Sequence, residues 1–356
     1  MKDWKDCKNI LCIRADNMGD VLMSTPAISA LKNYTGARIT LLTSSKGAAA
    51  ASLIPSIAEV IVFDLPWLKL ERQEGPVAIF SLLELLKEKQ FEGCVIFTVY
   101  SQNPLPAAML AYLAEIPLRL AYCRENPYAL LSHWLPDEEP YQLIRHQVKR
   151  DLELVGSIGA DSSDQRMQIA LRPEAWKTAV LKMTRRGLDI NRPFLILHPG
   201  VSEIKRRYPM EKWAGFGRCV LKEMPLQLLI TGLKEEEEVC TKLENWIGNG
   251  AFSLAGLLDT AEFAAVIAHA EVIVSVNTAT VHLASALKKP VVVLYAQSNP
   301  QHTPWMTPHR LLFFSIANQH KSKNQVIAYV DHKCYQEERP LPDEQEILSA
   351  LRSLCQ

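Results

Sequence analysis

The chain has 356 residues, more than one hydrophobic core usually holds, so we expect two domains. Its 39 basic and 39 acidic residues cancel to a net charge of zero, which gives no electrostatic reason to expect a nucleic-acid partner. No apolar run approaches the roughly 20 residues that span a bilayer. The eight cysteines form no C-x-x-C pair, which is typical of a reduced cytoplasmic protein without a zinc site.

Short apolar segments alternate with amphipathic ones along the whole chain, the pattern of βαβ units on parallel sheets. In the first half we predict strands at 10–14, 39–43, 60–63, 94–99 and 118–121 and helices at 21–34, 79–89, 105–113 and 143–158. A polar loop at 159–164 and a helix at 173–186 lead into the second half. There we predict strands at 194–197, 227–230, 272–276 and 291–295 and helices at 212–223, 235–247, 261–269, 280–287 and 342–354.

This alternation predicts an α/β fold with two Rossmann-like domains whose parallel sheets face each other across a cleft. We expect an N-terminal acceptor-binding domain at 1–172 and a C-terminal nucleotide-sugar-binding domain at 173–335. A helical segment at 336–356 is expected to pack back on the body.

The segment from Ile10 to Pro26 reads as a strand, a turn with Gly19 and Asp20, and a helix. Asp20 therefore stands where open α/β folds bind ligands, at the end of a strand and the start of a helix. A carboxylate there also stabilises a helix N-terminus, so Asp20 is either a helix cap or a functional group. We expect Asp16 to be a solvated turn residue.

Three groups in the second half stand at predicted strand ends or at the helix starts after them. They are His198-Pro199-Gly200 with the basic segment 205–207, Thr231-Gly232 with Glu236, and Asn277-Thr278-Ala279 with His282. Because parallel strands end at one edge of a sheet, we expect these groups to gather there, facing the turn of Gly19 and Asp20.

Together these motifs resemble glycosyltransferase family 9, the bacterial heptosyltransferases of the lipopolysaccharide inner core. The resemblance rests on Arg-x-x-x-Met-Gly-Asp at 14–20, on His-Pro-Gly, on Thr-x-x-x-His-Leu-Ala at 278–284 and on the segment 145–154, in family order. It covers most of the chain. It implies the GT-B fold, an ADP-activated sugar donor, inversion of the anomeric carbon, and no metal or other cofactor.

By this resemblance Asp20 is the base that takes a proton from the acceptor hydroxyl, and Gly19 gives its turn a tight backbone. The positions implied to bind the donor are Arg14, Gly19, Ser202, Lys205, Arg206, Glu236, Leu258, Asn277, Thr278, Ala279 and His282. Three alternatives stay open: surface charge for the basic segment, a solvated helix face for Glu236, and ordinary core packing for Leu258.

Two positions depart from the family, which usually has Asp-Thr-Gly where this chain has Asn277-Thr278-Ala279. Asn277 keeps an acceptor oxygen but lacks the charge expected to bind sugar hydroxyls. Ala279 adds a Cβ where the backbone meets phosphate, and it tolerates left-handed geometry less well than glycine. These differences leave the identity of the donor sugar open.

The acceptor side is expected to involve Arg145, His146 and Arg150, with surface charge on an amphipathic helix as the alternative. The loop at 66–70 is a candidate acceptor or membrane-surface contact, unless Trp67 belongs to the core. We expect a cytoplasmic protein, with peripheral contact to the inner face of the cytoplasmic membrane as an extension of that expectation.

The predicted function is inverting transfer of a sugar, heptose by resemblance, from an ADP-sugar to a hydroxyl of a lipopolysaccharide-core-like glycolipid or other carbohydrate. One alternative is a glycosyltransferase with a different nucleotide sugar or acceptor. Another is a protein that binds nucleotide sugars without catalysis. A Rossmann oxidoreductase is not expected, because no G-x-G-x-x-G follows the first strand.

Overall fold

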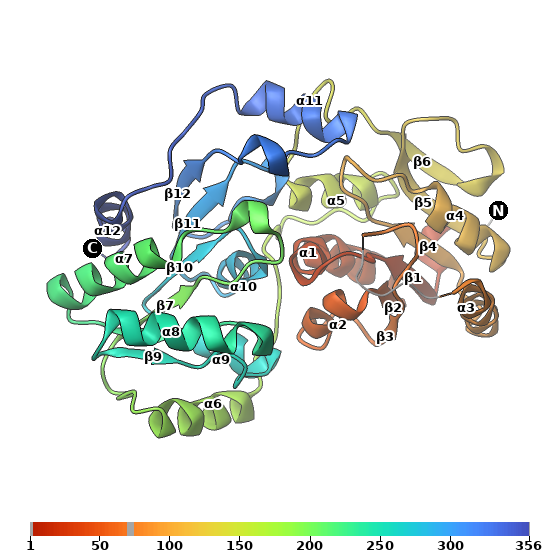
Figure 1. Ribbon diagram of the computed structural model, residues 1–356. Helices are drawn as coiled ribbons and strands as arrows, with labels where there is room; N and C mark the ends of the chain where they lie inside the picture. Colours follow the sequence, from red (N-terminus) through yellow and green to blue (C-terminus); the bar gives the residue numbers. More distant parts are fainter. Residues whose placement is uncertain (1–2, 70–74, 356) are drawn as a thin grey trace. The chain divides into compact units, whose positions relative to one another are not determined.

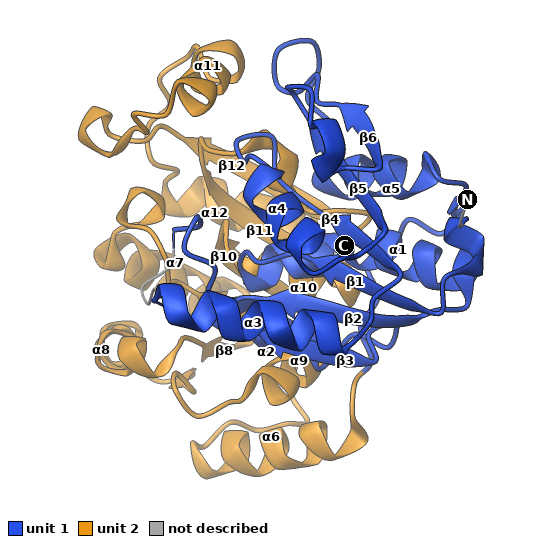
Figure 2. Cartoon of the chain, turned by 90° about the vertical axis from the view of Figure 1, so that its right-hand side faces the viewer, with its two compact units in different colours: residues 1–170 blue, residues 171–356 orange. Residues whose placement is uncertain are grey.

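The computed structural model describes residues 3–69 and 75–355, and helices flank the strands throughout (Figure 1). The chain divides into two compact units, residues 1–170 and 171–356 (Figure 2). Within the described residues each unit is built on a six-stranded parallel sheet. The predicted α/β class, with two Rossmann-like units, is therefore confirmed.

Unit 1 has the strand order β3-β2-β1-β4-β5-β6. Its strands are β1 (Asn9–Ile13), β2 (Arg38–Thr43), β3 (Glu59–Val62), β4 (Gly93–Ile96), β5 (Leu118–Cys123) and β6 (His133–Pro136). Its helices are α1 (Met18–Thr35), α2 (Ser45–Ala51), α3 (Pro76–Glu88), α4 (Leu105–Leu113) and α5 (Gln147–Gly156), with short 3₁₀ turns at Trp4–Asp6 and Tyr128–Leu130. Helices α1, α2 and α5 pack together, whereas α3 and α4 contribute to the hydrophobic core that includes Leu11 and Cys94 of the sheet.

Local sequence explains how the first βα unit forms. Strand β1 is apolar and almost wholly buried, as expected of a strand covered on both faces of a parallel sheet. Helix α1 contains Pro26, which has no N–H to donate to the carbonyl of Leu22. The hydroxyl of Thr25 donates to that carbonyl instead, at 2.7 Å. The helix ends at Gly36, whose φ of 67° is the left-handed conformation that glycine adopts easily.

Unit 2 has the strand order β12-β11-β10-β7-β8-β9. Its strands are β7 (Phe194–His198), β8 (Gln227–Ile230), β9 (Ala251–Ser253), β10 (Val272–Val276), β11 (Val291–Ala296) and β12 (His309–Phe314). Its helices are α6 (Pro173–Arg185), α7 (Met210–Glu223), α8 (Glu237–Ile247), α9 (Thr260–His269), α10 (Ala279–Ala286), α11 (Gln325–Cys334) and α12 (Glu344–Arg352), with 3₁₀ turns at Ile204–Arg206, Lys234–Glu236, Pro300–His302 and Asn318–His320.

The C-terminal helix α12 packs within unit 2. It contacts α7, and its Ile347, Leu348 and Leu351 join Trp213 of α7 in one buried cluster with the sheet. Helix α7 also contacts α8, whereas α6 packs on α9.

The predicted central elements are all present, but several elements at the edges were not predicted. These are α2, β6, β9, β12 and α11. The edge strands β6 and β12 are largely half-buried or exposed, so they lack the continuous apolar run that identified the central strands. Trp67 is half-buried and packs against the core of unit 1, while residue 70 of its loop lies outside the described residues.

Both sheets share one topological feature that positions a site. The chain runs outward from β1 through β2 to β3 and then crosses back to β4, and from β7 through β8 to β9 before crossing back to β10. In open α/β sheets ligands bind beyond the strand ends at such reversals. The segments that follow β1, β4, β7 and β10 are therefore the places to look for function. None of the helices in residues 3–69 and 75–355 combines the length and apolar composition of a membrane span.

Candidate functional site

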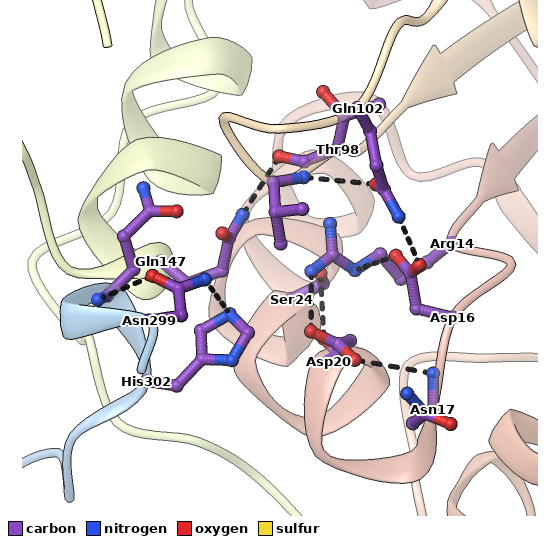
Figure 3. A network of polar contacts seen from close by, with 12 residues as sticks. Arg14, Asp16, Asn17, Asp20, Ser24, Thr98, Gln102, Gln147, Asn299 and His302 are labelled. Carbon is purple, nitrogen blue, oxygen red and sulfur yellow. Dashed lines mark hydrogen bonds and ion pairs between the residues drawn. The ribbon is translucent and has the colours of Figure 1, made fainter. Parts of the chain in front are cut away.

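Asp20 lies in the first turn of α1 and makes two kinds of contact (Figure 3). Its Oδ2 accepts a hydrogen bond from the backbone N–H of Asn17 at 3.3 Å, the contact of a helix cap. Its Oδ1 accepts from Nη2 of Arg14 at 3.1 Å. The side chain of Asp20 is 12% exposed, so this capping carboxylate also reaches the surface beyond the end of β1.

Gly19 lies inside the first turn of α1 rather than in a tight turn before the helix. It is not among the residues with positive φ. A left-handed turn is therefore not the reason for a glycine at this position.

Arg14 is fully buried directly after β1 and holds two carboxylates. Besides its bond to Asp20, its Nε lies 3.4 Å from Oδ2 of Asp16. Burial alone lowers the pKa of Arg14, but Asp16, Asp20 and the more distant Asp151 outweigh burial and raise it. The guanidinium is therefore a permanent positive charge at this site. Within the described residues, its Nη1 has no hydrogen-bond partner.

Asp16 is not the solvated turn residue that we expected. Its side chain is only 12% exposed, and its Oδ1 accepts from Nε2 of Gln102 at 2.5 Å. Burial raises the pKa of Asp16 to about 6, with Arg14 acting in the opposite direction and Asp20 adding to the rise. Gln102 lies in the segment after β4, and Asp16 lies in the segment after β1. Because β4 and β1 are neighbours in the sheet, the two side chains can meet beyond the strand ends.

A second layer of buried polar groups links α1 to α5, and sequence reasoning did not find it. Ser24 of α1 donates to Oδ2 of Asp151 at 2.6 Å, and Gln147 donates to Oδ1 of the same carboxylate at 2.7 Å. Burial raises the pKa of Asp151. Asp151 follows Arg150 in a helix that also carries other charged residues, so the sequence does not indicate that its side chain is buried.

The three residues predicted to bind an acceptor are engaged inside unit 1. Arg150 is fully buried and donates to Asp137 at 2.7 Å and Glu139 at 2.8 Å. His146 caps α5, its Nδ1 accepting from the N–H of Val148 at 3.2 Å. Arg145 pairs with Glu153 and lies 3.7 Å from Glu139. Because Arg150 is fully buried, the prediction that it contacts an acceptor is wrong.

In unit 2, Glu236 packs against the backbone at the ends of β7 and β8. A Cβ built on Gly200 would lie 2.4 Å from both carboxylate oxygens, and one on Gly232 would lie 2.9 Å from Oε2. The N–H of Leu233 donates to Oε2 at 2.7 Å. Glu236 is half-buried, unlike the exposed Glu235 and Glu238 of the same acidic run, so it differs from a solvated helix face.

Leu258 and Ser202 lie in two different loops of unit 2. Leu258 is half-buried in the loop between β9 and α9. That loop is tied to the turn after β8, because the N–H of Gly256 donates to the carbonyl of Gly232 at 3.0 Å. Ser202 is exposed in the loop after β7.

Arg206 and Lys205 both pair with Glu203, Arg206 through its Nη2 at 3.0 Å, but they differ in their other contacts. Nη1 of Arg206 donates to the carbonyl of Asn277 at 2.9 Å, which places the guanidinium at the start of α10. Lys205 pairs with Glu203 at 3.3 Å, and its charge acts on Asp331 of α11. Arg206 is therefore the basic residue nearer to the N-terminus of α10.

Hydrogen bonds from Asn277 hold the segment before α10 against the end of β11 and the residues that follow it. Oδ1 of Asn277 accepts from the N–H of Ala296 at 3.3 Å, and its Nδ2 donates to Ser298 at 2.9 Å. Thr278 is the N-cap of α10, and Ala279 is its first residue. Ala279 is not among the residues with positive φ, so its Cβ brings no left-handed strain. His282 is buried in the same helix.

His198 lies at the end of β7 and is half-buried. Its Nδ1 is 2.9 Å from the hydroxyl of Thr231, and its ring stacks on Phe263 with centroids 5.5 Å apart. Burial lowers the pKa of His198 to about 4, so the ring is neutral near pH 7.

This shifted pKa makes stability depend on pH in a defined direction. The pKa of His198 is about 4 in the folded protein and 6.5 in the unfolded chain. Between these two pH values the unfolded chain therefore binds a proton that the folded protein does not. The free energy of unfolding is expected to fall by about 3 kcal/mol through His198 as the pH drops from 6.5 to 4. Urea unfolding curves measure this quantity at each pH. In H198N the free energy of unfolding is expected to fall less over the same pH range, because the contribution of His198 is absent. An unchanged pH dependence in H198N would contradict the prediction.

A family model described as glycosyltransferase family 9 (heptosyltransferase) matches residues 79–331. The chain is 24% identical to lipopolysaccharide heptosyltransferase 2 of Salmonella typhimurium over 358 residues, covering 97% of this chain and 98% of the relative. The structure of the E. coli ADP-heptose lipopolysaccharide heptosyltransferase II aligns with a TM-score of 0.72 at 20% identity, covering 98% of each chain. A family 9 glycosyltransferase from Veillonella parvula aligns with a TM-score of 0.77 at 16% identity, covering 98% of this chain and 97% of that one.

Proposed function

Because the chain belongs to glycosyltransferase family 9, we propose that it moves a sugar from an ADP-sugar to a hydroxyl of a lipopolysaccharide-core-like acceptor, with inversion. Heptose is the proposed sugar, in keeping with the ADP-heptose enzyme among its structural relatives. The observation that carries the proposal is the partly exposed carboxylate of Asp20, fixed by Arg14 at the sheet reversal of unit 1.

On the acceptor side, Asp20 would accept the proton of the attacking hydroxyl. The acceptor oxygen forms its bond to C1 of the sugar as the bond from C1 to the phosphate oxygen breaks, and ADP leaves. Arg14 holds the carboxylate in place, and its buried Nη1, which lacks a partner within the described residues, is suited to an oxygen of the bound substrates.

On the donor side, the leaving diphosphate needs positive charge. Arg206 and the N-terminus of α10, with Thr278 and His282 beside it, would supply that charge, with Lys205 as a second cation. Glu236 would accept hydrogen bonds from the ribose hydroxyls, and Leu258 would line the adenine pocket. The packing of Glu236 against Gly200 supports this assignment, because only a residue without a Cβ leaves room for the carboxylate.

This packing predicts a selective effect of one methyl group. G200A is expected to displace the carboxylate of Glu236 and to weaken ADP binding roughly tenfold, the effect of losing a hydrogen bond to a charged group. Isothermal titration calorimetry measures the affinity. G75A is the matched control, since a Cβ there meets nothing within 4 Å and its φ is −73°. Equal affinities for G200A and wild type would remove Glu236 from the ribose site.

We also propose that transfer needs no metal ion, because protein cations and a helix N-terminus can neutralise the diphosphate. Transfer measured with EDTA and then with added magnesium tests this point, and loss of activity in EDTA would contradict it. The acceptor is proposed to be a glycolipid presented at the inner face of the cytoplasmic membrane, with the protein in the cytoplasm. Sedimentation with vesicles that carry the acceptor measures that contact.

The first experiment is calorimetry with ADP, UDP, GDP and dTDP side by side. Selective binding of ADP supports the proposed donor, and a transfer assay with ADP-heptose follows. Preference for another nucleotide would overturn the donor while leaving the family intact. No binding by any of the four would favour a protein that kept the fold and lost the site.

A different donor sugar is the second candidate, and one contact favours it. Nδ2 of Asn277 lies 3.5 Å from the carbonyl of Ala296 and 2.9 Å from Ser298. A carboxylate at 277 would face that carbonyl with an oxygen, so the site is built for a neutral amide. Transfer from other ADP-sugars at a rate above that from ADP-heptose would establish this alternative.

A further inference from the structure

Two carboxylates share one buried guanidinium in unit 1, although the proposed reaction uses only one of them. Asp20 bonds to Nη2 of Arg14 at 3.1 Å, and Asp16 lies 3.4 Å from Nε of the same side chain. Both carboxylates are 12% exposed, and Arg14 is fully buried. With both ionised, the group carries one negative charge in excess.

The neighbouring charges do not relieve this excess. Asp151 of α5 adds a further negative charge that acts on Arg14. The guanidinium of Arg150 on the same helix is already bound to Asp137 and Glu139. One carboxylate of the pair is therefore expected to take up a proton more readily than a solvated aspartate does.

Asp16 is held more firmly than a passive neighbour of Arg14 would be. Nε2 of Gln102 donates to its Oδ1 at 2.5 Å. The other end of that amide is occupied, since Oε1 of Gln102 accepts from the N–H of Val99 at 3.2 Å. The hydroxyl of Ser44 fixes the backbone carbonyl of Asp16 at 2.5 Å. Together these contacts aim the Asp16 carboxylate at Arg14.

We propose that Asp16 is a positioning residue for Asp20, and that its ionisation, acting through the shared Arg14, adds a second pH-dependent step to sugar transfer. The inference rests on the proposed role of Asp20 as the base. When Asp16 is ionised, it draws part of the charge of Arg14, and Asp20 is a stronger proton acceptor. When Asp16 is protonated, the full charge of Arg14 falls on Asp20 and weakens it as a base.

The sign of the effect follows from the same groups. Charges and dipoles facing Asp16 come from Arg14 at the end of β1, from Asp20 on α1 and from Gln102 after β4. Burial among them raises the pKa of Asp16 to about 6. The rate constant kcat is therefore expected to rise roughly three- to tenfold as the pH increases through this value.

The test is the pH profile of kcat for wild type and three variants. D16N is expected to stay at the low level of the wild-type step and to lose the rise near pH 6. Q102L removes the donor that favours the ionised carboxylate, so its step is expected to move up by roughly one pH unit. D64N is the matched control, because Asp64 is a buried carboxylate of the same unit that bonds to Ser45. It is expected to keep the wild-type step.

A ligand-free readout separates this inference from the proposed function. In ¹³C-carboxyl NMR of the full chain, the signal of Asp20 is expected to shift as Asp16 titrates, and to lose that shift in D16N. The inference would be overturned if the kcat of D16N still rose near pH 6. It would also be overturned if the Asp20 signal did not shift as Asp16 titrates. A rate loss in D16N as large as that in D20N would overturn it as well, because Asp16 would then be the base itself. If wild type transfers no sugar, the proposed function fails and the NMR titration alone decides the coupling.

Discussion

D20N is expected to lower kcat for sugar transfer by about 10²- to 10⁴-fold, the usual contribution of a general base. Asparagine keeps an oxygen that can accept from the N–H of Asn17, so the helix cap survives while the charge is lost. ADP affinity is expected to stay at the wild-type value, because the contacts proposed for the nucleotide, those of Arg206, Glu236 and Leu258, come from unit 2. Initial rates with saturating donor and calorimetry with ADP measure the two quantities.

This substitution distinguishes the two interpretations of Asp20 that the sequence left open. If Asp20 only caps α1, D20N will transfer sugar at nearly the wild-type rate, and the proposed mechanism will be wrong. D64N provides the control for a carboxylate-to-amide change elsewhere in unit 1. A loss of ADP binding in D20N would show that the variant disturbs more than the proton transfer.

R150M is expected to reduce the free energy of unfolding by about 3–5 kcal/mol, the usual effect of removing one partner from a buried ion pair. The variant removes the cation that Asp137 and Glu139 share, although their side chains are only 4% and 0% exposed. It leaves them the longer contacts with Arg124 at 3.5 Å and Arg145 at 3.7 Å. It also removes the donor to the carbonyl of Thr98 and the guanidinium stacked on Tyr122. Urea unfolding followed by circular dichroism measures the change.

R166M is the matched control for the loss of an arginine from an ion pair. Arg166 pairs with Asp164 at 2.7 Å, but both side chains are well exposed, so its loss is expected to change stability by less than about 1 kcal/mol. Equal stability of R150M and wild type, with a raised KM for the acceptor alone, would restore Arg150 as an acceptor-binding residue.

D20N and R150M also distinguish a site that takes part in the reaction from one that stabilises the fold of unit 1. Arg14 and Arg150 are both fully buried arginines that hold two carboxylates each. The carboxylates at Arg14 remain partly exposed, whereas those at Arg150 are sealed. Exposure of the partner, rather than of the arginine, is what marks the site that a substrate can reach.

The sequence alone determined the central elements and the place of the proposed base. Strands such as β1 and β10 are buried on both faces, so each appears in the sequence as a short apolar run that needs no partner to be identified. A carboxylate directly after such a run, at a helix start, is visible as a candidate for the same reason. The edge strands β6 and β12 escaped prediction because partial exposure removes that signal.

Only the tertiary structure decided which charged residues meet. Gln102 reaches Asp16 because β4 lies beside β1, and Arg150 reaches Asp137 and Glu139 inside the fold rather than at its surface. A charged residue looks alike in sequence whether water or a buried partner neutralises it. Strand order and burial choose between the two, and both depend on contacts between residues far apart in the chain.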